Sequence, residues 1–148
     1  MARRLVREKA LQTLYQYEMN PGMRERVVAK EVNELEPQVS PDDLSFFKRL
    51  TEGVIHHQEK LDEVIQGYLR NNWTISRLPS LDRIILRMAL FELVFEEEIP
   101  YGVTLNEAVD LAKTFSTEES RKFINGVLAS MVKEMETIRK SFTGEADA

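Results

Sequence analysis

The sequence has 148 residues, enough to bury a hydrophobic core in one domain, and its 43% hydrophobic and 30% charged residues are typical of a folded globular protein. This composition excludes a disordered chain, and the absence of cysteine excludes disulfides and thiolate metal sites. The net charge of −5 by itself argues against nucleic-acid binding, and there is no run of about 18 apolar residues that would predict a membrane span.

The first predicted helix starts close to the N-terminus and ends at the turn Asn20–Gly22. Apolar residues recur along it at spacings of three and four, which predicts a buried stripe. The stripe consists of Val6, Ala10, Leu14 and Tyr17. Residues 1–30 carry seven cations and three anions, a net charge of +4, whereas the rest of the chain carries −9. This asymmetry predicts a local anion-binding surface.

Two more helices are expected before residue 70. One covers roughly residues 24–35 and is predicted to bury Val28, Val32 and Leu35. The other is long and starts at Ser40, which can cap it, with Pro41 in its first turn. Gly53 and the polar stretch "HHQEK" predict a bend in this helix, whose inner face ends near Tyr68.

The second half begins with a connector, residues 71–80, followed by a segment that is apolar on nearly every side, residues 81–98. Such a helix is expected at the centre of a bundle. Thr104 with Glu107 forms a capping-box pattern that predicts a short helix through about Thr114. Ser116 with Glu119 repeats the pattern and opens a last helix, which keeps its apolar spacing to near Phe142.

No strand alternation is present, so we predict an all-α fold, a compact bundle of about six or seven helices. The expected organisation is a single domain over residues 1–142, made of two small helical sub-bundles at about 1–70 and 80–142. Residues 143–148 are expected to form a loose C-terminal tail. From the lack of cysteine and of an apolar signal segment, we expect a cytoplasmic protein, with no membrane association.

Motifs for catalysis or metal binding are missing. The sequence has no phosphate-binding glycine loop and no nucleophile elbow. His56 and His57 are adjacent and would point about 100° apart on a helix, so they cannot share a metal ion. His57 falls in register between Val54 and Leu61 and is interpreted as a partly buried structural histidine. We therefore predict no catalytic residue, no metal and no cofactor.

Two segments combine cations with an aromatic residue. On the first helix, Arg4, Arg7 and Tyr15 lie within a sector of about 80°. In the last helix, Arg121 and Lys122 lie in the first turns, where free amides already attract anions, and Phe123 follows them. Guanidinium groups that contact phosphates beside a ring that stacks on a base suit single-stranded nucleic acid. The alternative interpretation of both segments is solvated surface charge, with Tyr15 packed in the core. Gly126, inside the last helix, predicts the close approach of another helix.

Four stretches together resemble the NusB family of bacterial transcription antitermination factors: "ARRLVREKALQTLYQYE", "LDRIILRMALFEL", "IPYGVTLNEAVDLAKTF" and "STEESRKFINGVL". The resemblance covers nearly the whole chain and implies an all-helical protein built from two small sub-bundles. Family members pair with the ribosomal protein NusE, and the pair binds boxA, a short single-stranded RNA element in nascent ribosomal RNA leaders. The complex joins elongating RNA polymerase and suppresses premature termination. A NusB-like domain also begins certain ribosomal RNA cytosine methyltransferases, but we expect the free-standing factor.

The resemblance also implies a set of RNA-binding positions in this sequence, to which the charge pattern adds Arg121. They are Arg3, Arg4, Arg7, Tyr15, Tyr68, Glu119, Ser120, Arg121, Lys122 and Phe123. For Tyr68, the helical spacing alone favours core packing. The expected partners are boxA RNA, NusE and the RNA polymerase antitermination complex, with the protein itself a monomer or weak homodimer. The alternative function is a helical protein–protein interaction adaptor without direct RNA contact, and an enzyme of unrecognised type is disfavoured by the missing motifs.

Overall fold

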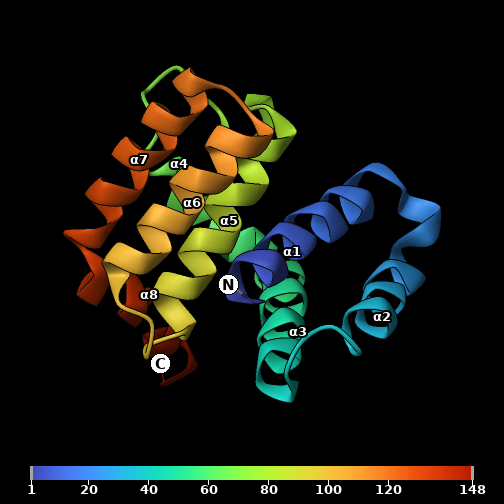
Figure 1. Cartoon of the computed structure of the whole chain (residues 1–148). Coiled ribbons are helices and arrows are strands. Elements are labelled where there is room, and N and C mark those ends of the chain that lie inside the picture. The colour runs from blue at the N-terminus through green and yellow to red at the C-terminus, as the bar shows by residue number, and fades with distance from the viewer. Residues whose placement is uncertain (1, 148) are drawn as a thin grey trace. The chain divides into compact units, whose positions relative to one another are not determined.

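The computed structural model describes the backbone of residues 2–147 and the side chains of residues 3–143, and this part of the chain is helical without strands (Figure 1). The α-helices are α1 (Ala2–Met19), α2 (Arg24–Leu35), α3 (Pro41–His56), α4 (Gln58–Gln66), α5 (Ser80–Phe95), α6 (Tyr101–Phe115), α7 (Glu118–Val132) and α8 (Met135–Asp147). Two 3₁₀ turns, η1 (Pro21–Met23) and η2 (Ile75–Arg77), lie in the connections. The predicted all-α class is confirmed.

Eight α-helices are present within residues 2–147, so the predicted six or seven is slightly low. The bend expected in the long helix is a true break, with α3 ending at His56 and α4 beginning at Gln58. The last helix is interrupted as well, because the amide of Glu134 donates to the carbonyl of Met131 at 2.9 Å in a tighter turn. The α-helical pattern resumes where the amide of Ile138 donates to the Glu134 carbonyl.

The chain forms two compact units, Met1–His56 and His57–Ala148. The boundary therefore falls at the break between α3 and α4, earlier than the connector at residues 71–80 where the sequence placed it. In the first unit α1 packs against both α2 and α3. Its core contains Phe46, Phe47 and Leu50 of α3 and most of the predicted stripe of α1, whereas Tyr17 is only partly buried.

Helix α2 is turned slightly from the predicted orientation. Val27 and Leu35 are its buried residues, while Val28 and Val32 are half-buried. The predicted start of α3 is confirmed, because the hydroxyl of Ser40 accepts a hydrogen bond from the amide of Asp43 at 3.1 Å. That bond satisfies one of the amides left free at a helix start.

In the second unit α5 is the central helix, as predicted, and contacts α4, α6, α7 and α8. Every residue from Ile84 to Val94 is buried, including Arg87 and Glu92. Both buried charges have partners: the guanidinium of Arg87 donates to both carboxylate oxygens of Asp62 at 2.7 and 2.8 Å, and Glu92 accepts from Thr104 at 3.3 Å. Pairing of this kind offsets the cost of removing charges from water.

Two predicted helix starts are wrong. Helix α6 begins at Tyr101 after Pro100, so Thr104 is not a cap but a buried residue inside the helix. The helix starts earlier because the carbonyl of Pro100 accepts hydrogen bonds from the amides of Val103 at 3.0 Å and Thr104 at 3.4 Å, while the hydroxyl of Thr104 donates to Glu92. Helix α7 is capped by Thr117 instead of Ser116: its hydroxyl accepts from the amide of Ser120 at 3.0 Å.

The remaining structural predictions concern the tail and His57. Helix α8 continues to Asp147, so residues 143–147 of the expected loose tail are helical, and Ala148 lies outside the described residues. His57 is half-buried and stacks on Phe95 with ring centroids 4.7 Å apart, as its structural interpretation predicts. Among the residues described, no helix is long and apolar enough to cross a membrane.

Candidate nucleic-acid interface

A hollow of about 460 Å³ lies between the end of α4, the connector after it and one face of α7. We call it the aromatic hollow. It is lined by Tyr68, Leu69, Arg70, Trp73, Lys122, Phe123, Gly126, Val127 and Ser130. All of these residues belong to the second unit. Three of the predicted RNA-binding residues, Tyr68, Lys122 and Phe123, therefore line one surface although more than 50 residues separate Tyr68 from Lys122 in the chain.

The aromatic hollow takes its name from an indole and a phenyl ring that contact each other at a tilt. The rings of Trp73 and Phe123 lie 5.4 Å apart at an angle of 51°, and Trp73 remains 38% exposed. Gln66 fixes the connector: its side-chain NH₂ donates to the carbonyl of Trp73 at 2.7 Å, and its side-chain oxygen accepts from the amide of Ile75 at 2.9 Å. These two hydrogen bonds from Gln66 fix the backbone at Trp73 and Ile75, and they thereby hold the exposed indole in place.

Tyr68 lines the same hollow and is half-buried. Its hydroxyl donates a hydrogen bond to the carboxylate of Glu134, in the turn between α7 and α8. Burial, and then this hydrogen bond and the nearby negative charge, raise the pKa of Tyr68 to about 12. The phenol is therefore neutral at physiological pH, and its ring is tethered at the edge of the hollow.

Two cations of the aromatic hollow, Arg70 and Lys122, have no ion-pair partner within residues 3–143. The guanidinium of Arg70 lies 5.6 Å from the centroid of the Trp73 ring. Arg121 differs from its neighbour, because its Nε donates to Glu118 at 2.9 Å. This bond lowers the pKa of Glu118 and raises that of Arg121. Arg121 is thus engaged by Glu118, whereas Arg70 and Lys122 form no ion pair among the described residues.

The start of α7 is anchored to α5 through Asp82, which is buried. Its two carboxylate oxygens accept hydrogen bonds from Ser116 at 2.9 Å and from Ser120 at 2.7 Å. Ser120 is itself buried, with its hydroxyl engaged inside the protein, whereas Glu119 is exposed. This network fixes the first turn of α7 and with it the direction in which Lys122 and Phe123 leave the helix.

In the first unit the structure separates the predicted arginines. Arg3 donates to Asp43 at 2.8 Å and to Asp42 at 3.0 Å, and it lies over the ring of Phe46. Arg7 is buried, with its guanidinium 5.2 Å from the same ring. Arg4, by contrast, is exposed.

Tyr15 of α1 is 40% exposed, so the alternative interpretation that it is a core residue is wrong. It lies on the same helix as Arg4, three turns further along. An exposed ring and an exposed cation on one helix are what a contact with a single strand requires.

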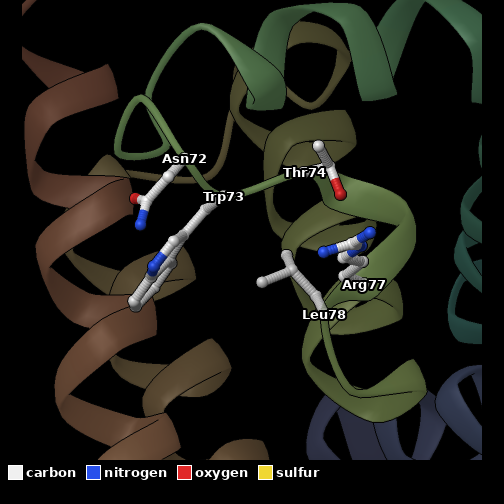
Figure 2. A pocket seen from close by; sticks show the side chains of 5 residues that line it. All are labelled: Asn72, Trp73, Thr74, Arg77 and Leu78. Carbon is white, nitrogen blue, oxygen red and sulfur yellow. The ribbon is translucent and has the colours of Figure 1, made fainter.

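A second hollow of about 350 Å³ shares Trp73 with the first (Figure 2). Figure 2 shows the indole on one side of the opening and Leu78 and Arg77 on the other, with Thr74 above them. Asn72 completes the lining. Trp73 therefore borders both hollows and is the residue most central to this surface.

Arg70 and Trp73 are the functional candidates that the sequence reasoning missed. The signal was present, since Trp73 is the only tryptophan of the chain and stands in a polar connector where no core position was expected. The interpretation of Gly126 was wrong. A Cβ atom added there would meet no atom within 4 Å, so no other helix approaches it.

Comparison with known proteins shows the family of the chain. The family model described as "NusB family" matches residues 4–133. Proteins named transcription antitermination protein NusB are similar to the chain: that of Symbiobacterium thermophilum is 42% identical, covering 91% of this chain and 92% of the relative, and that of Bacillus subtilis is 39% identical, covering 92% and 98%.

Solved structures agree with the sequence comparison. T. maritima NusB superposes with a TM-score of 0.80 at 33% identity, covering 89% of this chain and 91% of that one. A structure described as antitermination factors NusB and NusE in complex with dsRNA gives a TM-score of 0.75 at 28% identity, covering 95% and 97%. The family match spans most of the chain, and the relatives align over nearly their full length. The chain belongs to the NusB family.

Proposed function

We propose that this protein is an RNA-binding transcription antitermination factor that, together with NusE, binds the boxA element of nascent ribosomal RNA leaders and helps RNA polymerase read through terminators. The names of its relatives support this function, and the similar structure described with NusE and dsRNA supports pairing with NusE and contact with RNA. The observation that carries the RNA contact is the aromatic hollow, where Arg70 and Lys122, without an ion-pair partner among the described residues, lie beside the exposed indole of Trp73.

The chemistry of the aromatic hollow fits a single strand. Each base stacked on an aromatic side chain contributes roughly 1–3 kcal/mol, and the stacking tolerates any base. Phosphates of the same strand would lie on Lys122 and Arg70, which have the right charge and form no ion pair among the described residues. A duplex would gain less here, because its bases are already stacked on each other and their faces are covered.

The predicted RNA-binding residues take different roles in this proposal. Lys122 and Phe123 contact the RNA, with Tyr68 at the edge of the hollow. Ser120 and Arg121 act indirectly, because the hydroxyl of Ser120 is held by Asp82 and the guanidinium of Arg121 by Glu118. Glu119 is exposed beside them.

In the first unit, Arg4 and Tyr15 are the proposed RNA contacts. Arg3 and Arg7 are assigned to holding α1 against α3, since both guanidinium groups lie on Phe46. The hydrogen bond from Arg3 to Asp43 would have to break before this arginine could reach a phosphate.

The experiment that tests the function uses Trp73 as an internal reporter. It is the only tryptophan and borders the aromatic hollow, so a base stacking on it should quench its fluorescence. The full chain is titrated with a boxA-like single strand, a scrambled single strand and a duplex, each with and without NusE, and binding is also followed by the anisotropy of labelled RNA. We expect quenching, with the tightest binding for boxA in the presence of NusE. Binding to NusE without any RNA contact would instead support the protein–protein adaptor.

A further inference from the structure

Gly126 stands at an unexpected position, in the middle of α7. Glycine in a helix interior costs about 1 kcal/mol relative to alanine, so it needs a reason. The backbone does not supply one, since no glycine among residues 2–147 has a positive φ. Packing does not supply one either, because an added Cβ would meet no atom within 4 Å. Within the protein itself, therefore, nothing requires glycine here.

The place of Gly126 in the aromatic hollow is more informative. Lys122, Gly126 and Ser130 are spaced by four residues, so they follow one another along the same face of α7, and all three line the hollow. The hydroxyl of Ser130 donates to the carbonyl of Gly126 at 3.1 Å, which folds that side chain back onto the helix. Between Lys122 and Ser130, this face of α7 thus presents bare backbone at residue 126.

We propose that Gly126 is a contact position for the bound RNA strand, where a nucleotide lies directly against the backbone of α7. This inference rests on the proposed function and extends it to a residue outside the predicted set. The occupant is single-stranded RNA because the hollow offers Arg70 and Lys122, which form no ion pair among the described residues, for its phosphates, and the exposed indole of Trp73 for a base. A side chain at residue 126 would fill the space that the nucleotide takes.

The test separates stability from binding, because the two should change in opposite directions. Gly126→Ala should raise the melting temperature by about 2–4 °C, since alanine is the better helix former and has room. The same change should weaken binding of the boxA-like single strand, and Gly126→Leu should weaken it further. The upper limit is the loss of one stacked base, roughly 5- to 160-fold in affinity.

Gly102 provides a matched control. It lies in α6, also has no atom within 4 Å of an added Cβ, and does not line the aromatic hollow. Gly102→Leu should therefore leave RNA affinity unchanged. Circular dichroism of each variant verifies that the helices are intact.

The outcomes distinguish this inference from the function on which it rests. If the parent protein binds the single strand and Lys122→Glu abolishes binding, while Gly126→Leu binds like the parent, then Gly126 is not a contact and the inference fails alone. If the parent protein binds no RNA even with NusE, both fail. If Gly126→Leu and Gly102→Leu lose affinity equally, the effect is not local to the hollow, and the inference is again overturned.

Discussion

The two unpaired cations of the aromatic hollow lead to a quantitative prediction about salt. If Arg70 and Lys122 each neutralise one phosphate, replacing both with alanine should lower the salt dependence of RNA binding. For a single strand, the slope of log affinity on log salt is about −0.7 per neutralised phosphate, so the double variant should lose about 1.4 from the slope. Between about 50 and 200 mM salt this difference corresponds to roughly a sevenfold smaller decrease in affinity than for the parent.

Arg121→Ala is the control for this measurement, because it removes the same charge from the neighbouring position. Its guanidinium already binds Glu118, so its loss should leave the slope nearly unchanged. Affinities are measured by anisotropy of labelled RNA at four or more salt concentrations. A double variant with the slope of the parent would refute the assignment of Arg70 and Lys122 to phosphates. A slope change in Arg121→Ala equal to that of a single hollow cation would refute the argument from ion pairing.

Three further predictions follow from the same surface. Asp82→Ala removes the acceptor of the buried Ser120 hydroxyl and of the half-buried Ser116 hydroxyl, and should lower the free energy of unfolding by about 1–3 kcal/mol, measured by urea denaturation. Trp73→Leu should weaken single-strand binding by about 1–3 kcal/mol while duplex binding changes little, and an equal loss for both would argue against stacking. In an ultraviolet titration, Tyr68 should ionise near pH 12, and Glu134→Gln should move its pKa back toward 10.0. Because this pKa is raised by folding, its contribution to stability is present below pH 10 and is lost as the pH rises toward 12.

The sequence alone was sufficient for the fold class and for much of the core. Apolar spacing of three and four identified the buried stripe of α1, and an all-round apolar segment identified α5 as the central helix. Ser40 was recognised as a cap because its bond to Asp43 is local. Leu35 was likewise placed in the core by the period of its own helix, and it is buried. The family resemblance depended on contiguous stretches and was confirmed.

Only the tertiary structure decided which charged and aromatic residues are available to a ligand. Arg3, Arg4 and Arg7 look alike in the sequence, yet Arg3 is paired with α3 and Arg7 is buried. Ser116 fits a capping box, but its hydroxyl is taken by Asp82, which is 34 residues away in the chain. Such partners come from other helices, and no local pattern contains them.

The aromatic hollow also depends on contacts between segments that are distant in the chain. Trp73 stands in a connector with no periodicity, and it faces Phe123 only because Gln66 holds the connector and α7 packs against α5. Gly126 was misread for a related reason: a sequence shows that a side chain is missing but not whether the space is filled. Helical periodicity is a local property and can be read along the chain, whereas the contents of a hollow depend on which distant segments meet there.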